Sequence, residues 1–282
     1  MSIKRFLVIA LIAAIGFTSV AQSACQTKTS LDIRGSDTIV NLGAAWAEKF
    51  MAKNAKYTVA VQGGGSSTGA TALINKNADI AQMSRPMKDT EKAEVKKSTD
   101  KDAKEFIVAY DGVAMVVHKD NPISELTMAQ LAQIFKGEVT NWKDLGGPNA
   151  TIVVLSRDTA SGTHVFIKEH VLGNAEYGSN VQFLSSTQAI HNEVAQNPQA
   201  IGYIGLGYLD AAVKAIAVKK DDSSPAVLPS VATVKDKTYV VSRPLYNYTA
   251  GDPSGLIKTY LDFVMGAEGQ KIVADLGFVP IK

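Results

Sequence analysis

The sequence of 282 residues has only one cysteine and four histidines, and these scarcities exclude several kinds of site. A single thiol, Cys25, cannot form an internal disulfide. The histidines are dispersed and no cysteine pair accompanies them, so we expect neither a metal site nor a cofactor. After Phe17, no apolar stretch is long enough to cross a membrane.

The chain also lacks an excess of either charge. It has 29 Lys and Arg against 27 Asp and Glu, a formal net charge of +2. Lys4 and Arg5 supply this surplus, so the region after residue 25 is formally neutral. No basic block indicates nucleic-acid binding. If such a protein binds an anion, it must use local dipoles and individual charges rather than an overall field.

Residues 1–24 have the pattern of an export signal. Lys4 and Arg5 form a charged start, and residues 6–17 form an apolar segment that is short for a spanning helix. Small residues follow at Ala21, Ser23 and Ala24. We therefore expect a periplasmic protein, and an uncleaved N-terminal anchor is the alternative.

Cys25 follows this segment directly, which suggests attachment of a lipid and a membrane-tethered protein. Lipoprotein signals prefer a branched apolar residue three positions upstream, where this chain has Gln22. Cleavage after Ser23, with Ala21 three positions before the cut, is an equally good interpretation. The sequence leaves both open.

The stretch 156–164, Ser-Arg-Asp-Thr-Ala-Ser-Gly-Thr-His, is the most informative part of the chain. The apolar run 150–155 before it predicts a buried strand, and residues 165–170 after it predict a helix. The first N–H groups of a helix have no intrahelical partner and lie at the positive end of its dipole. A hydroxyl-rich turn at this position is therefore suited to binding an oxyanion.

Two more turns of the same kind occur earlier. Residues 35–38, Gly-Ser-Asp-Thr, lie between an expected strand and a helical pattern over 39–50. Residues 63–69, Gly-Gly-Gly-Ser-Ser-Thr-Gly, lie between the expected strand 57–62 and a helix over 70–76. The glycine-rich turn lacks the Gly-Lys-Ser/Thr ending of a P-loop, so ATP hydrolysis is not expected. Three helix N-termini could meet at one anion.

In this order, the three turns resemble those of the periplasmic phosphate-binding proteins of bacterial phosphate ABC transporters. Residues 131–147, Leu-Ala-Gln-Ile-Phe-Lys-Gly-Glu-Val-Thr-Asn-Trp-Lys-Asp-Leu-Gly-Gly, add to the resemblance. So do Ser-Arg-Pro at 84–86 and Ala-Ile-Gly-Tyr at 200–203. The resemblance covers nearly the whole mature chain and rests on the order and spacing of the motifs together.

This resemblance implies an α/β fold, a two-lobed periplasmic binding protein of type II with its ligand cleft between the lobes. Alternating strand and helix patterns agree with this fold class. We expect one lobe from residues 27–112 and 246–282 and the other from residues 113–245. The tripeptide Tyr-Asp-Gly at 110–112 is interpreted as a hinge-like turn before the apolar strand 113–117.

The family pattern assigns phosphate-binding roles to the three turns and to residues near them. The guanidinium of Arg157 suits bidentate contact with a tetrahedral oxyanion, and Asp158 is interpreted as the residue that orients it. The expected binding residues are Ser36, Asp37, Thr38, Ser66, Ser84, Arg85, Asp111, Arg157, Ser161, Gly162 and Thr163. Arg85 is either a second cationic contact or a structural residue beside Pro86.

One position departs from the best-known family member, which has an aspartate where this chain has Ser84. That aspartate accepts the proton of hydrogen phosphate, and a carboxylate there repels fully ionised sulfate. Asp111 is the first candidate for this acceptor and Asp37 is the second. Each has a simpler interpretation as a capping residue.

These interpretations predict a non-enzymatic receptor that binds inorganic phosphate, acts as a monomer and delivers its ligand to the membrane permease of an ABC importer. A receptor for sulfate, tungstate or molybdate is the first alternative. The second is a secreted hydrolase or phosphatase with a serine nucleophile, because Ser161 and His164 lie one helical turn apart. No Gly-x-Ser-x-Gly elbow surrounds Ser161.

Overall fold

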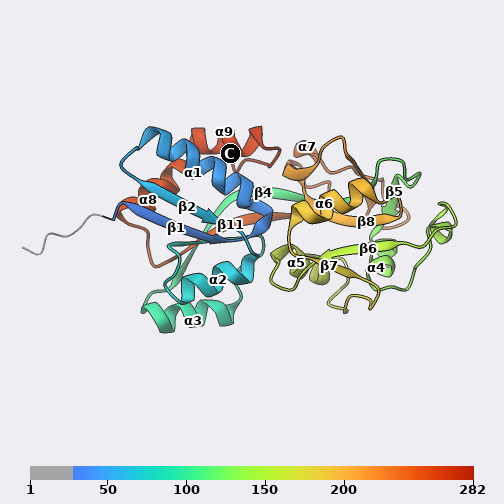
Figure 1. Cartoon of the computed structure of the whole chain (residues 1–282), viewed down its shortest axis with the longest axis horizontal. Coiled ribbons are helices and arrows are strands. Elements are labelled where there is room, and N and C mark those ends of the chain that lie inside the picture. Colours follow the sequence, from blue (N-terminus) through green and yellow to red (C-terminus); the bar gives the residue numbers. More distant parts are fainter. Residues whose placement is uncertain (1–27) are drawn as a thin grey trace, which may run out of the picture.

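The computed structural model describes residues 28–282. The expected export signal and Cys25 lie outside the described residues. Two groups of helices and strands stand side by side, and two strands connect them (Figure 1). Within the described residues, no helix is both long enough and apolar enough to span a membrane.

The first group contains the first two turns and both C-terminal helices. Its buried residues include Trp46, Phe50 and Tyr260, which pack between α1, α8 and the sheet. Its elements are β1 (Ser30–Gly35), η1 (Asp37–Ile39), α1 (Val40–Lys53), β2 (Thr58–Gln62), α2 (Ser66–Ile74), β3 (Ile80–Met83), α3 (Asp89–Thr99), α8 (Gly255–Met265) and α9 (Ala267–Asp275).

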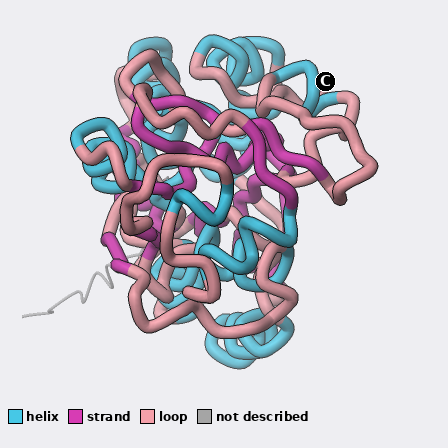
Figure 2. The backbone as a smooth tube through the Cα atoms, turned by 90° about the vertical axis from the view of Figure 1, so that its right-hand side faces the viewer, coloured by secondary structure: helices cyan, strands magenta, loops and turns pink. Residues whose placement is uncertain are grey.

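The second group contains the third turn and has its own core, in which Trp142, Phe135 and Tyr203 are buried. Figure 2 views this group end-on, with strands enclosed by helices and loops. Its elements are β5 (Glu125–Thr127), α4 (Met128–Phe135), η2 (Trp142–Leu145), β6 (Val153–Arg157), α5 (Gly162–His170), β7 (Gln182–Leu184), α6 (Thr187–Gln196), β8 (Ala200–Gly205), η3 (Leu206–Tyr208), β9 (Val213–Ala215), β10 (Ala217–Lys219) and α7 (Val231–Lys235).

The two groups share one sheet of the order β2-β1-β3-β11-β4-β8-β6-β7, with β9 also paired to β4. The two connecting strands are β4 (Ala103–His118) and β11 (Ser242–Ala250), and β11 pairs antiparallel with residues 103–112 of β4. The remaining strands, β5 and β10, form a small parallel sheet. The expected two-lobed α/β fold is confirmed.

The structure corrects the interpretation of Tyr110, Asp111 and Gly112 as a turn. These residues lie inside the 16-residue strand β4, where Asp111 pairs in register with Arg243 of β11. Gly112 is needed for another reason, because a Cβ there would lie 2.7 Å from a methyl group of Val234. The glycine lets α7 pack against the strand and does not reverse the chain.

Candidate functional site

The third turn connects β6 to α5 and has the expected form. Ser161 is the N-cap of α5, and its Oγ accepts the N–H groups of Thr163 at 3.1 Å and His164 at 3.4 Å. Ser161, Gly162 and Thr163 are all buried. The start of α5 therefore lies inside the protein, where the positive end of its dipole is poorly screened by water.

The glycine-rich turn brings α2 against this helix start. Gly65, with φ 107°, precedes Ser66, whose Oγ accepts the N–H of Ser84 at 3.0 Å. A Cβ on Gly162 would overlap the Ser66 hydroxyl and lie 2.7 Å from that of Ser84. Only glycine leaves room between these two hydroxyls and the start of α5. A methyl group at position 162 would fill this space.

The first turn, which leads into η1, also lies against the start of α5. The hydroxyls of Thr38 and Thr163 are 2.8 Å apart, and both residues are buried. Ser36 is 2% exposed, and its Oγ has no hydrogen-bond partner in residues 28–282. A buried hydroxyl without a partner is costly, so its presence indicates a ligand-facing position. All three turns meet in one region.

Arg157, at the end of β6, is 1% exposed and held by hydrogen bonds from several sides. Its Nη1 donates to Asp37 Oδ2 at 3.1 Å and to Thr187 Oγ1 at 2.9 Å, and its Nη2 donates to the Ser185 carbonyl at 2.9 Å. The expectation that Asp158 orients this arginine is wrong. Asp158 instead accepts the N–H of Ala160 and stabilises the turn.

Asp37 is thus the carboxylate that positions Arg157. It also accepts the N–H of Thr187 at 2.6 Å, and its own carbonyl accepts the Tyr208 hydroxyl at 2.9 Å. A further bond between the two groups runs from the Ser67 N–H to the Ala160 carbonyl at 3.1 Å. The two halves are therefore in contact across the site.

Asp111 is fully buried on β4. Its Oδ1 accepts the N–H of Leu206 at 2.9 Å, and its Oδ2 accepts from Arg243 Nη2 at 3.1 Å. Burial raises the pKa of the Asp111 carboxyl, although the charge of Arg243 opposes this shift. A Cβ on Gly205 would lie within 3.3 Å of both Asp111 oxygens and 3.0 Å from a methyl of Thr38. Asp111 therefore borders the region where the turns meet.

Arg243 is a site residue that no pattern in the sequence singles out. It is 4% exposed, its Nη2 also donates to Thr163 Oγ1 at 2.9 Å, and its guanidinium lies over the ring of Phe166. Its Nε and Nη1 have no hydrogen-bond partner within residues 28–282. A single arginine in an extended segment carries no motif, and only the pairing of β4 with β11 brings it beside Asp111.

Arg85 is not brought together with these residues. Its guanidinium forms two hydrogen bonds to the carboxylate of Glu91, at 2.8 and 2.7 Å, and also donates to Ser67 Oγ. This ion pair satisfies the charge of Arg85 within the first group. Of the two interpretations left open by the sequence, the structure favours the structural one.

His164 does not act on Ser161. Its Nδ1 lies 2.8 Å from the carbonyl oxygen of Arg157, and burial lowers the pKa of its imidazole. The Ser161 hydroxyl is used as an N-cap, as described above. The two side chains therefore lack the hydrogen bond that a nucleophile and its base require.

Comparison with known proteins places the chain in a family. Residues 20–268 match the family model described as the PBP superfamily domain. The phosphate-binding protein PstS of Pseudomonas aeruginosa is 32% identical over 276 residues, covering 92% of this chain and 85% of the relative. This chain belongs to the PstS family of phosphate-binding proteins. The PstS protein of Staphylococcus saprophyticus is 35% identical over 88% of this chain and 79% of its own length.

Solved structures agree with membership of the PstS family. A protein from Clostridium perfringens, assigned as the substrate-binding protein of a phosphate ABC transporter and solved with bound phosphate, is 34% identical. It matches with a TM-score of 0.79 over 90% of this chain and all of that one. An ABC-type phosphate transport receptor from Vibrio cholerae is 30% identical with a TM-score of 0.71, over 88% and 99% of the two chains. The family resemblance seen in the sequence is confirmed.

Proposed function

We propose that this protein is the substrate-binding component of a phosphate ABC importer and holds one inorganic phosphate between its two halves. The observation that carries the proposal is the convergence of three helix N-terminal turns. Gly162 lies against Ser66 and Ser84, and Thr163 lies against Thr38. Membership of the PstS family supports phosphate as the ligand.

The ligand is held by hydroxyl and backbone N–H groups. Helix N-termini and buried hydroxyls bind an oxyanion without a large net charge, which suits a chain whose charges nearly balance. Arg157 supplies one positive charge and is aimed by Asp37. Arg243 acts as a positioning residue through Thr163. The proposed binding residues are Ser36, Thr38, Ser66, Ser84, Arg157, Ser161, Gly162 and Thr163.

Asp111 is proposed as the acceptor of the phosphate proton. Each carboxylate oxygen can accept two hydrogen bonds, so Oδ1 and Oδ2 each retain one acceptor position beside Leu206 and Arg243. Asp37 is the weaker candidate because its carboxylate is already used to position Arg157 and to accept the N–H of Thr187. A carboxylate acceptor would reject sulfate, which has no proton to donate.

The lobes are proposed to comprise residues 27–112 with 246–282, and residues 113–245. The separate buried clusters around Trp46 and Trp142 support this division. The connecting strands β4 and β11 then form the hinge. Because the turns come from both lobes, phosphate binding would draw them together.

Location and partners follow from the same proposal. Residues 1–24 direct export to the periplasm, and Cys25 is a candidate for lipid attachment. The protein acts as a monomer that delivers phosphate to the membrane permease of the importer. It performs no catalysis, in keeping with the use of Ser161 as an N-cap and of His164 as a partner of the Arg157 carbonyl.

Identification of the ligand tests this proposal. Protein purified from phosphate-containing medium is denatured mildly, and the released small molecules are identified by mass spectrometry. We expect about one equivalent of inorganic phosphate per chain. Release of sulfate, molybdate or tungstate instead would contradict the choice of ligand. A covalently modified Ser161 would contradict the absence of catalysis.

A further inference from the structure

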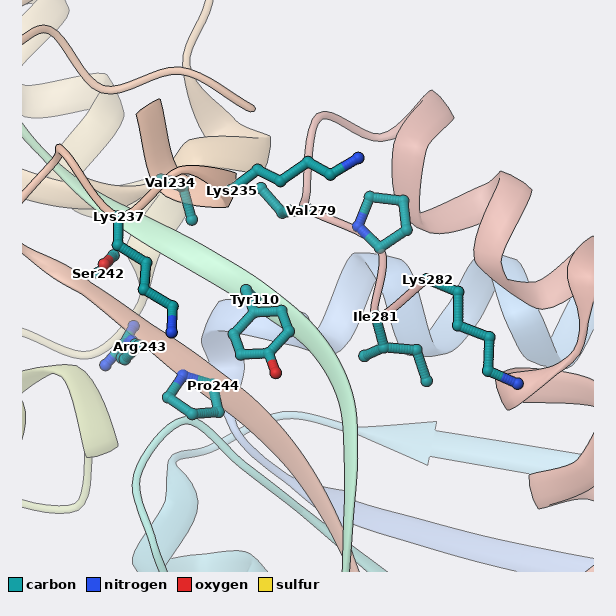
Figure 3. Close-up of a pocket in the computed structure, with 11 residues that line it drawn as sticks. Tyr110, Val234, Lys235, Lys237, Ser242, Arg243, Pro244, Val279, Ile281 and Lys282 are labelled. Carbon is teal, nitrogen blue, oxygen red and sulfur yellow. The ribbon is translucent and has the colours of Figure 1, made fainter. Parts of the chain in front are cut away.

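A cavity of about 500 Å³ lies beside the two connecting strands and shares Arg243 with the site described above. Its lining comes from β4, β11, the end of α7 and the C-terminal segment. In Figure 3 the ring of Tyr110 lies near the centre of this hinge pocket, with Lys237 and Ile281 on either side of it. The volume is within the range of about 300–1,000 Å³ that small-molecule sites occupy.

The hinge pocket and the proposed phosphate site use opposite faces of β4. Successive side chains of a strand point to opposite faces, so Tyr110 and Asp111 face different sides of the sheet. Asp111 contacts Arg243 and borders the phosphate site, whereas Tyr110 lines the pocket. The backbone of Tyr110 also exchanges two hydrogen bonds with Val279, at 2.8 and 3.0 Å, which fix the C-terminal wall.

The polar lining of the hinge pocket is mainly cationic. The side chains of Lys235, Lys237 and Lys282 contribute to it, and within residues 28–282 none of them has an ion-pair partner. The carboxylate of Asp236, between two of these lysines, accepts a hydrogen bond from Thr238 at 2.6 Å. Arg243 also lines the pocket, and two of its nitrogens lack hydrogen-bond partners among the described residues.

The remaining lining is apolar and aromatic. Val234 and Val279 are buried, Pro244 and Ile281 are partly buried, and the Tyr110 ring is 36% exposed. An exposed aromatic ring gains from stacking against a planar ligand. A negatively charged ligand would stabilise the lysine ammonium groups, because the apolar walls offer them no counter-charge.

We propose that the hinge pocket is a second ligand site, which binds a small amphipathic anion with a planar apolar body and one carboxylate or sulfonate group. The body packs between Tyr110 and the apolar walls, and the anionic group faces Lys235 and Lys237. Inorganic phosphate lacks the apolar body and binds elsewhere. The pocket is therefore distinct in chemistry as well as in position.

This site also modulates phosphate binding, a part of the inference that rests on the proposed function. The pocket walls come from α7 on one side and the C-terminal segment on the other, and the hinge strands lie between them. In this structure the two halves already touch across the proposed phosphate site, and the hinge pocket is present on the Tyr110 face. A ligand wedged there favours the closed form, and by linkage each ligand strengthens binding of the other.

A fluorescence titration of the whole chain with anilinonaphthalene sulfonate tests the proposal, because this probe combines a planar apolar body with one sulfonate. We expect 1:1 binding that weakens at least tenfold in the double variant Lys235→Gln/Lys237→Gln. The control Lys143→Gln/Lys220→Gln removes the same charge from exposed residues that do not line the pocket, and it should leave probe affinity unchanged. Equal affinities in the two variants, or binding of several probes per chain, would overturn the site.

The coupling is measured by repeating the titration with saturating phosphate. We expect probe affinity to rise at least threefold, and phosphate affinity, measured by calorimetry, to rise by the same factor with saturating probe. Unchanged probe affinity in protein that binds phosphate normally would overturn the coupling. Failure of calorimetry to detect phosphate binding would instead contradict the proposed function, while the phosphate-free titration still tests the pocket.

Discussion

Arg157 Nη1 lies 3.1 Å from Asp37 Oδ2, although 120 positions separate the two residues in the chain. The pair joins the start of η1 in one half to the end of β6 in the other. Arg157 is nearly fully buried and the Asp37 side chain is 16% exposed, so little water screens the interaction. The contact therefore serves two purposes, because it aims a guanidinium at the proposed ligand and holds the two halves together.

The Arg157–Asp37 pair should show strong coupling in a double-mutant cycle. Arg157→Ala is expected to weaken phosphate binding at least tenfold, because the charge is lost, and to lower the melting temperature, because Asp37 loses its partner. Asp37→Ala should weaken binding less. Calorimetry of both single variants and of the double variant should give a coupling free energy of about 0.5–3 kcal/mol. Strictly additive effects would show that the contact has no role in binding.

Gly162→Ala should block the site while sparing the fold. The new Cβ would overlap the Ser66 hydroxyl, whereas alanine is a better helix former than glycine. We expect at least a tenfold loss of phosphate affinity in calorimetry. The unliganded melting temperature should change by only a few degrees. Normal affinity in this variant would place the ligand away from the start of α5.

Two buried serines form a matched pair of tests. Ser36→Ala removes a hydroxyl without a partner among the described residues, so the free energy of unfolding without ligand should be unchanged. The free energy of phosphate binding should weaken by about 1 kcal/mol, which is roughly fivefold in affinity. Ser156→Ala removes a hydroxyl 2.7 Å from that of Tyr203. It should lower stability by about 1 kcal/mol and leave affinity unchanged. The reverse pattern in urea unfolding and calorimetry would contradict the assignment of Ser36.

Asp111→Asn should reduce the preference for phosphate over sulfate. Asparagine removes the repulsion between Asp111 and a fully ionised ligand and can donate a hydrogen bond to it. Asp37→Asn is the comparison, because Asp37 is assigned to positioning Arg157; it should weaken both ligands alike. The measurement is the ratio of the two affinities in each variant. A ratio equal to that of the wild type in Asp111→Asn would assign selectivity to the hydroxyl groups instead.

Stability should fall in mild acid because of His164. Burial lowers the pKa of this imidazole in the folded protein, so the neutral form is favoured there. Its contribution to stability is complete above the unfolded pKa of about 6.5 and is lost as the pH falls through the lowered folded value. The melting temperature should therefore decrease between pH 7 and pH 5, and less steeply in His164→Gln. The control His170→Gln changes an exposed histidine at the end of the same helix. If His170→Gln flattened the profile equally, His164 would not be the group responsible.

The turns and the fold class could be predicted from the sequence because their signals are local. Glycine followed by hydroxyl residues between a strand and a helix specifies a row of N–H groups that have no partner within the helix. The N-cap of α4 is local in the same sense, because the Thr127 side chain accepts the N–H of Gln130, three residues later. Such features depend on neighbours within a few residues along the chain.

The partners of the charged residues could not be predicted, because they depend on strand pairing. Asp158 is adjacent to Arg157 in sequence but accepts the Ala160 N–H, whereas Asp37 reaches Arg157 through the packing of the two halves. Arg243 meets Asp111 only through the register of β11 on β4. Gly112 has the composition of a turn but serves close packing inside a strand. Each error followed from treating a long-range relationship as a local one.

Calorimetric titration of the mature, ligand-free protein with phosphate, sulfate and molybdate tests the central claim most directly. The convergence of three turns between the halves predicts one phosphate per chain, no requirement for metal after treatment with a chelator, and weaker binding of the other two ions. Tighter binding of sulfate or molybdate, or loss of phosphate binding on chelation, would contradict this account.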